Sequence, residues 1–133
     1  MNYWLIKSEP SVYSWETFEK EKKAVWDGVR NYAARLNLKA MKKGDLAFFY
    51  HSNEGKEIVG VAKITKEFYP DPKDNEWVVV EVAPEHKLKN PVTLAQVKST
   101  KKLAEMALIK LSRLSVQPVK KEEFDLVMAM SEE

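Results

Sequence analysis

The chain has 133 residues, a length that fits one domain able to bury a core without disulfides or metals. Apolar residues make up 44% of it and charged residues 32%, a composition typical of soluble globular domains. The absence of cysteine excludes disulfides, thiolate catalysis, iron–sulfur clusters and cysteine zinc sites. We expect a monomeric, cytoplasmic single domain over residues 1–133, with no cofactor, no metal site and no membrane segment.

The first half of the chain predicts one strand followed by two helices. Residues 2–7 are rich in aromatic and aliphatic side chains, as in a strand, and Pro10 ends this pattern. Ser14 fits the N-cap of a helix over residues 15–23, and Asn31 fits the N-cap of a helix over about 32–41. Asp27 and Gly28 form a turn dipeptide between these helices.

The second half predicts a meander of strands with short helices after it. Strands are expected over residues 46–51, 58–68 and 77–83, and Gly60 indicates a bulge or a barrel corner. Thr93 and Gln96 match a capping box, which predicts a short helix there. A partly helical segment over 103–111, a strand over 114–119 and a helix over 122–130 complete the chain. This order predicts an α+β domain whose mostly antiparallel sheet is curled or closed to cover its edges.

Three short clusters of polar and aromatic residues lie where predicted elements end: residues 7–10 (KSEP), 26–31 (WDGVRN) and 50–53 (YHSN). Together they offer an indole and a phenol for stacking, and Ser, Asp, Asn and His side chains for hydrogen bonding. A planar heterocycle needs both kinds of group, one for its face and one for its edge. We expect the three clusters to converge on one pocket, with Trp26 as the stacking face.

Each cluster also has a purely structural interpretation. Trp26, next to a helix start, can be a core residue, and His51 can be a satisfied polar group at the end of a strand. Asp27 can serve only the turn, and Asn31 only as an N-cap. The sequence contains no nucleophile elbow, phosphate-binding loop or dinucleotide motif, so a binding role is favoured over a catalytic one.

The net charge is only +2, but the basic residues are unevenly distributed. Two stretches hold five basic residues each and no acid: Arg30, Arg35, Lys39, Lys42 and Lys43, then Lys87, Lys89, Lys98, Lys101 and Lys102. If the fold brings the stretches together they form a phosphate-facing surface; otherwise they are solvated faces on opposite sides. From the first stretch, the residues assigned to a nucleic-acid surface are Arg35, Lys39, Lys42 and Lys43.

Four segments resemble the EVE domain, a family that includes thymocyte nuclear proteins and small bacterial homologues. The segments are YWLIKSEP (3–10), WDGVRNYAARLNLKAMKKGDLAFFYHSN (26–53), VGVAKITKEFYPDP (59–72) and RLSVQPVKKEEF (113–124). They occur in the family's order and span nearly the whole chain. The resemblance implies a PUA-like fold, a small β-barrel of about five to six strands with flanking helices, related to the YTH domains that read methylated RNA bases.

The resemblance also implies a function: a non-catalytic domain that binds RNA or DNA and accommodates a base, a modified one in particular, in an aromatic and polar pocket. Carried over by position, the ligand-binding residues are Lys7, Ser8, Trp26, Asp27, Arg30, Asn31, Tyr50, His51, Ser52, Tyr69, Asp71, Arg113 and Ser115. The alternative is a PUA-like RNA-processing enzyme, a ribonuclease or an RNA-modifying protein, that uses Lys7, Asp27 and His51. The loop after Pro72 is shorter than in the longer members, which leaves the identity of the ligand open.

Overall fold

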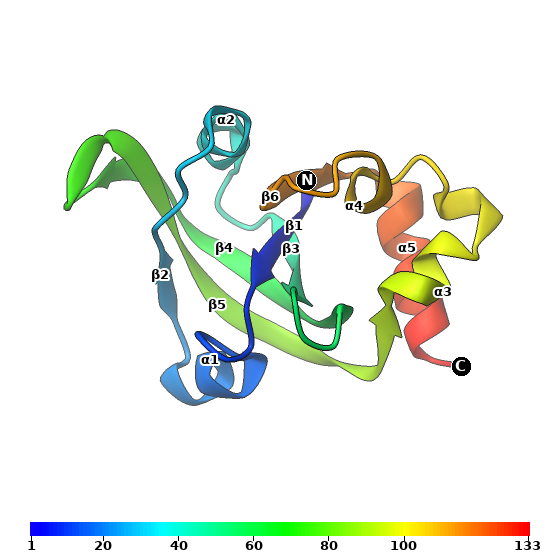
Figure 1. Ribbon diagram of the computed structural model, residues 1–133. Helices are drawn as coiled ribbons and strands as arrows, with labels where there is room; N and C mark the ends of the chain where they lie inside the picture. Colours follow the sequence, from blue (N-terminus) through cyan, green and yellow to red (C-terminus); the bar gives the residue numbers. More distant parts are fainter.

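The computed structural model describes residues 1–133 and contains six strands, five α-helices and one 3₁₀ turn (Figure 1). In chain order they are β1 (Tyr3–Ser8), α1 (Trp15–Glu21), β2 (Ala24–Trp26), α2 (Tyr32–Ala40), β3 (Leu46–His51), β4 (Glu57–Asp71), β5 (Asp74–Thr93), α3 (Leu94–Lys98), η1 (Lys101–Leu103), α4 (Ala107–Lys110), β6 (Val116–Val119) and α5 (Lys121–Ser131). The expected α+β class, with six strands and flanking helices, is confirmed. None of the helices is long and apolar enough to cross a membrane.

All six strands form one curled sheet in the order β2-β5-β4-β3-β1-β6. The pairs are antiparallel except for β1 and β3, which run parallel, with Leu5 opposite Phe48. The two edge strands, β2 and β6, pair with one neighbour each and not with each other. The sheet is therefore barrel-like but open along one seam, and this seam is bordered by β2 and by the β1–β6 pair.

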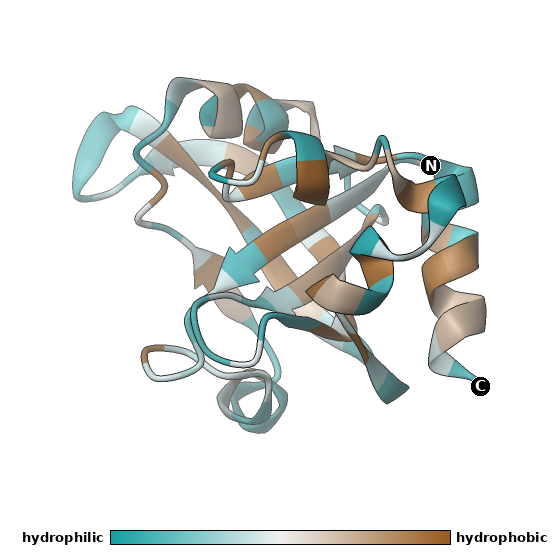
Figure 2. Cartoon of the chain, turned by 45° about the vertical axis from the view of Figure 1, so that its right-hand side comes forward, coloured by the Kyte–Doolittle hydropathy of each residue, from teal (hydrophilic) through white to brown (hydrophobic).

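The core has two parts, one on each face of the sheet, because side chains alternate along the strands. Phe49 belongs to the first part, which also receives Trp15 from α1 and Leu38 from α2. Phe48 belongs to the second part, which is covered by α3, α4 and α5, with Phe124 of α5 stacked on it. Figure 2 shows apolar colour along the central strands and along α5, whereas the tip of the β4–β5 hairpin is hydrophilic.

Two features of the sheet differ from the sequence-based expectation. The strand β2, which has only three residues, is not among the expected strands. The strand β5 covers 20 residues rather than the seven of 77–83, and its second half contains Pro84 and several charged residues. Proline is tolerated here because the β4–β5 register shifts between Val61 and Ala62, the residue opposite Pro84, so the strand bends there.

Candidate functional site

A cavity of about 750 Å³ lies at the open seam of the sheet. Its walls come from the end of β1, the turn before α1, the end of α1, the edge strand β2 with the segment after it, and the residue that precedes β6. The lining residues are Lys7, Ser8, Glu9, Val12, Tyr13, Glu21, Lys23, Ala24, Val25, Trp26, Asp27, Gly28, Val29, Arg30 and Ser115. The volume falls in the range of about 300–1,000 Å³ that is usual for small-molecule sites.

The aromatic part of this wall consists of Trp26 and Tyr13. Their rings meet edge to face, with centroids 6.3 Å apart and 72° between the planes. Trp26 also packs edge to face on Phe49, at 5.6 Å, and it is 9% exposed. The Ser8 hydroxyl donates to the Tyr13 carbonyl oxygen, which ties the turn before α1 to the end of β1. Trp26 is therefore at once a residue of the first core and a wall of the cavity.

The polar groups around the cavity carry both signs of charge: the cations are Lys7, Lys23 and Arg30, and the anions are Glu9, Glu21 and Asp27. The Tyr13 hydroxyl donates to Glu21 Oε1 at 2.7 Å. Burial first, and then Glu21 as acceptor and charge, raise the pKa of Tyr13 far above its usual value, so its hydroxyl remains a donor at neutral pH. Asp27 is exposed and has no partner side chain, so its carboxylate is free to accept from a ligand.

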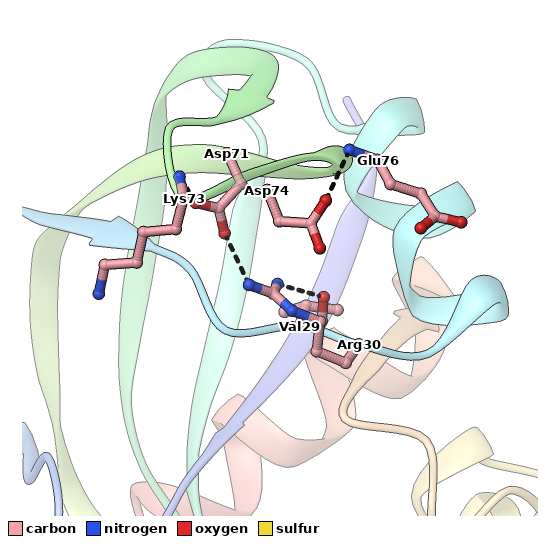
Figure 3. A network of polar contacts seen from close by, with 6 residues as sticks. All are labelled: Val29, Arg30, Asp71, Lys73, Asp74 and Glu76. Carbon is pink, nitrogen blue, oxygen red and sulfur yellow. Dashed lines mark hydrogen bonds and ion pairs between the residues drawn. The ribbon is translucent and has the colours of Figure 1, made fainter.

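Arg30 is held at the cavity rim by neighbours on both sides (Figure 3). One guanidinium nitrogen donates to the Val29 carbonyl oxygen at 3.0 Å, and the other lies 3.3 Å from the buried carboxylate of Asp71. The backbone N–H of Lys73 first, and then Arg30, lower the pKa of Asp71. The ion pair with a fixed carboxylate orients Arg30, whose side chain is still 40% exposed and can contact a phosphate.

Residues of two of the three predicted clusters line the cavity; the third cluster is paired with the first along β1 and β3 but does not line it. The predicted residues that line the cavity are Lys7, Ser8, Trp26, Asp27, Arg30 and Ser115. Lys7 also donates to the Ser112 carbonyl oxygen at 2.6 Å, and burial lowers its pKa. Asp71 lies behind Arg30 and reaches the site only through it.

The third cluster is placed elsewhere by the alternation of β3. Tyr50 points to the second core, where it is 3% exposed and burial raises its pKa. His51 points toward α1, and its Nε2 accepts the backbone N–H of Trp15 at 3.1 Å. Burial lowers the pKa of His51. Ser52 meets the first cluster only through its backbone N–H, which donates to the Ser8 carbonyl oxygen at 2.9 Å. The expectation that all three clusters share one pocket is thus corrected.

Three further predicted residues also lie outside the cavity lining. Asn31 is the N-cap of α2, and its Oδ1 accepts the Ala34 N–H at 3.0 Å. The Tyr69 hydroxyl donates to Glu81 at 2.6 Å, and that bond is the main reason why the pKa of Tyr69 is raised to about 12. Arg113 is exposed in the segment before β6 and is not among the lining residues.

The basic stretches lie on different sides of the molecule. Lys39, Lys42 and Lys43 are exposed on and after α2, on the side of the first core. Arg35 is half-buried instead: it donates to the Glu76 carbonyl oxygen at 2.8 Å and is not a free surface cation. The stretch from 87 to 102 runs through β5, α3 and η1, which enclose the second core, so the two stretches do not form one surface around the cavity.

Sequence reasoning missed six residues of the lining: Val12, Tyr13, Glu21, Lys23, Ala24 and Val25. Tyr13 lies in the turn before α1. Val12 and Val25 are exposed by 78% and 47%, which makes them an apolar rim. A signal was present, because Val12 and Tyr13 directly follow the first cluster and Val25 precedes the second, and loops at strand ends often carry binding residues.

Comparison with known proteins places these features in a family context. The model of the EVE domain matches residues 2–130. Thymocyte nuclear protein 1 of Mus musculus is 38% identical over 167 aligned positions, covering 98% of this chain and 74% of the relative. A protein of Rhodopseudomonas palustris, solved by NMR, is 54% identical, with a TM-score of 0.96 over 99% of this chain and 94% of that chain. The alignment with the mouse relative is longer than this chain, so that relative carries insertions.

Human THYN1 in complex with 5-methylcytosine-containing DNA is 35% identical, with a TM-score of 0.89 over 100% of this chain and 99% of that chain. A more distant likeness, the ASCH protein of Zymomonas mobilis, is 11% identical with a TM-score of 0.60 over 97% of this chain and 95% of that chain. At that identity the likeness concerns the fold alone, and it supports the barrel-like architecture.

Proposed function

The chain belongs to the EVE domain family, and we propose that its cavity binds a nucleobase of DNA, in particular a modified cytosine such as 5-methylcytosine. The observation that carries this proposal is the seam cavity of about 750 Å³, walled by Trp26 and Tyr13 and rimmed by donors and acceptors. The human relative that forms a complex with 5-methylcytosine-containing DNA supports this choice of ligand.

The lining of the cavity suits the face, the edge and the methyl group of a modified base. The rings of Trp26 and Tyr13 offer aromatic surface to a base. Ser8, Asp27 and Ser115 offer hydrogen-bonding groups to its edge, and Asp27 can accept from an exocyclic amine. The apolar rim of Val12 and Val25 suits a methyl group.

The phosphate is expected beside a cation of the rim. Lys23 and Arg30 both line the cavity, and Arg30 is already oriented by Asp71. A base taken from a duplex must leave its stack at a cost of a few kcal/mol, and stacking on aromatic side chains is worth about 1–3 kcal/mol per base. Binding of a base by this cavity is therefore energetically feasible only if stacking, edge contacts and phosphate contacts act together.

The proposal is tested by fluorescence anisotropy with a short labelled DNA that carries one 5-methylcytosine. The matched ligands are the same DNA with unmodified cytosine and the RNA of the same sequence. We expect the modified DNA to bind most tightly. If modified and unmodified DNA bind equally tightly, the proposed preference for modified cytosine is wrong. If the RNA binds more tightly than either DNA, the ligand is RNA.

The variant Asp27→Asn adds a test of the cavity itself. It keeps the size of the side chain but replaces an acceptor by a mixed donor and acceptor, so the preference between modified and unmodified bases should change more than the total affinity. The matched control is Asp125→Asn, an exposed aspartate on α5, on the other side of the sheet. If both variants and wild type show the same preference between modified and unmodified DNA, Asp27 does not contact the bound base.

No observation favours the catalytic alternative. It requires Lys7, Asp27 and His51 to act together, and only Lys7 and Asp27 line the cavity. His51 Nε2 already accepts the backbone N–H of Trp15. The three groups therefore do not form one acid–base site in this structure.

A further inference from the structure

Four side chains form a continuous cluster of arginines and aromatic rings between the cavity rim and α2. The guanidinium carbons of Arg30 and Arg35 lie 5.7 Å and 5.5 Å from the ring centroid of Trp77. Arg35 also lies 4.9 Å from the ring centroid of Tyr32, and the rings of Tyr32 and Trp77 are 5.2 Å apart at 30°. We name Tyr32, Arg35 and Trp77 the α2 platform; Arg30 connects it to the cavity, because Arg30 also lines the cavity.

The outermost ring of the α2 platform is open to solvent although it is held in place. Tyr32 is 60% exposed, whereas Trp77 beneath it is 9% exposed. The Tyr32 hydroxyl donates to a Glu76 carboxylate oxygen at 3.3 Å, at the edge of the ring. Arg35 donates to the Glu76 carbonyl oxygen at 2.8 Å, so the guanidinium beside the two rings is fixed as well. Tyr32 thus presents an oriented aromatic surface that the core does not use.

The basic α2 segment favours an anionic strand as partner of the α2 platform, and Glu76 of β5 adds one carboxylate at the edge of the Tyr32 ring. No acid occurs between Asp27 and Asp45, and Lys39 and Lys43 lie exposed farther along this segment. Lys39 lies 5.8 Å from the ring centroid of Phe68, which is 44% exposed. From Tyr32 to Lys39 the helix rises roughly 10 Å, about the length of three stacked nucleotides. Exposed aromatic rings flanked by cations are the usual means of binding unpaired nucleotides.

We propose that Tyr32 stacks on the nucleotide next to the base that the cavity holds, so that the chain binds an unpaired or locally opened strand. This inference rests on the proposed function and extends it from a single base to the strand around it. Arg30 lies between the cavity and the α2 platform. In this arrangement its guanidinium contacts the phosphate that joins the two nucleotides. The α2 platform then adds affinity without reading the base, because every base has a face that can stack.

The experiment compares two ligands by calorimetry: 5-methyl-2′-deoxycytidine 5′-monophosphate, and a trinucleotide with 5-methylcytosine at its centre and thymine on both sides. We expect wild type to bind the trinucleotide about 5- to 150-fold more tightly than the mononucleotide. Tyr32→Leu, which keeps an apolar side chain but has no ring, should lose most of this gain and bind the mononucleotide like wild type. Tyr32→Phe should retain the gain.

The matched control is Leu36→Ala, one turn along α2 and 62% exposed, which should bind both ligands like wild type. If the trinucleotide binds no more tightly than the mononucleotide, or if Tyr32→Leu keeps the full gain, the inference is wrong while the proposed function stands. If neither ligand binds wild type, both are wrong. Circular dichroism of each variant shows that the fold is retained.

Discussion

The indole of Trp26 and the phenol ring of Tyr13 meet edge to face, with centroids 6.3 Å apart, in the wall of the seam cavity. Trp26 comes from the edge strand β2 and Tyr13 from the turn before α1. The same indole packs on Phe49 in the first core. The aromatic wall of the cavity is therefore partly made of core residues. Substitutions in it should change both the stability of the protein and its affinity for the ligand.

For this reason Trp26→Ala should destabilise the protein as well as weaken binding. Removing a buried tryptophan side chain costs about 3–5 kcal/mol, since the surrounding rings cannot fill the space. Trp26→Phe keeps an aromatic ring against Phe49 and should cost less. Urea denaturation of both variants measures the difference. A free energy of unfolding for Trp26→Ala within 1 kcal/mol of wild type, on the order of a surface substitution, would show that Trp26 is not a core residue.

Gly60 is required by the packing of Trp15. A Cβ atom at position 60 would lie 2.5 Å, 2.6 Å and 2.7 Å from the Cη2, Cζ3 and Cε3 atoms of the Trp15 indole. Trp15 is 2% exposed and is held by Phe18 and Phe49, so it has little room to move. Gly60→Ala should lower the free energy of unfolding by about 1–3 kcal/mol, the usual cost of overpacking.

A double-mutant cycle separates this contact from any backbone effect of the substitution. In a Trp15→Leu background the contact is removed, and Gly60→Ala should cost much less. The same cost in both backgrounds would mean that the Trp15 indole is not the cause. Thermal and urea denaturation give the two measurements.

His51 should make stability depend on pH. Its Nε2 accepts the Trp15 N–H only when unprotonated, and burial lowers its pKa from 6.5 despite the opposing charges of Glu57 and Glu16. Above about pH 6.5 the histidine is neutral in the folded and the unfolded chain, so this hydrogen bond contributes fully. As the pH falls below that value, His51 becomes protonated in the unfolded chain but stays neutral in the folded chain, because its pKa there is lower. The free energy of unfolding should therefore fall until the pH passes the folded pKa.

Urea denaturation between about pH 7.5 and pH 5.5 measures this effect. His51→Gln keeps an acceptor but cannot titrate, so its stability should change less over this range than that of wild type. His86→Gln is the matched control, because the second histidine is exposed on β5 and should leave the wild-type dependence in place. If His51→Gln and wild type lose stability in parallel, His51 is not the titrating group.

The lysines on and after α2 should determine the salt dependence of nucleic-acid binding. Lys39, Lys42 and Lys43 are exposed on the side of the first core, to which the cavity belongs. Each lysine that contacts a phosphate adds about 0.7–0.9 to the slope of log affinity against log salt. Replacing all three by alanine should flatten that slope.

The matched control replaces three exposed lysines of the second stretch, Lys98, Lys101 and Lys102, which lie beside the second core. This change removes the same charge from the other side of the molecule, and we expect the slope to stay as in wild type. Equal flattening by both triple variants would show that overall charge, rather than a surface beside the cavity, drives the association.

Much of this fold could be predicted from local sequence signals. The capping residues Ser14, Asn31 and Thr93 each cap a helix as expected, because a cap depends on a few neighbouring residues. The length of β5 and the existence of β2 could not be predicted. The residues after Pro84 alternate poorly and are charged, and a three-residue edge strand is defined by its partner rather than by its own sequence.

The kinds of residue in the candidate site could be predicted from the sequence, but which residues line the cavity could not. Ser8 and Trp26 lie in conspicuous motifs, and both line the cavity. Tyr50 and His51 are neighbours in sequence, yet they point to opposite faces of β3, and neither lines the cavity. Which face of a strand meets a cavity depends on register and on long-range pairing, which one sequence does not reveal.

The most direct test of the seam cavity as a base-binding site is a nuclear magnetic resonance titration of ¹⁵N-labelled protein with 5-methyl-2′-deoxycytidine 5′-monophosphate. Each of the four tryptophan indoles gives its own N–H signal, so the ligand can be located without a substitution. We expect the Trp26 indole and the backbone amides of Ser8 and Asp27 to shift. The Trp4 indole, which donates to Asp45 at 3.0 Å, should stay unchanged. An unchanged Trp26 signal, or shifts confined to α3 and η1, would contradict the assignment of the cavity.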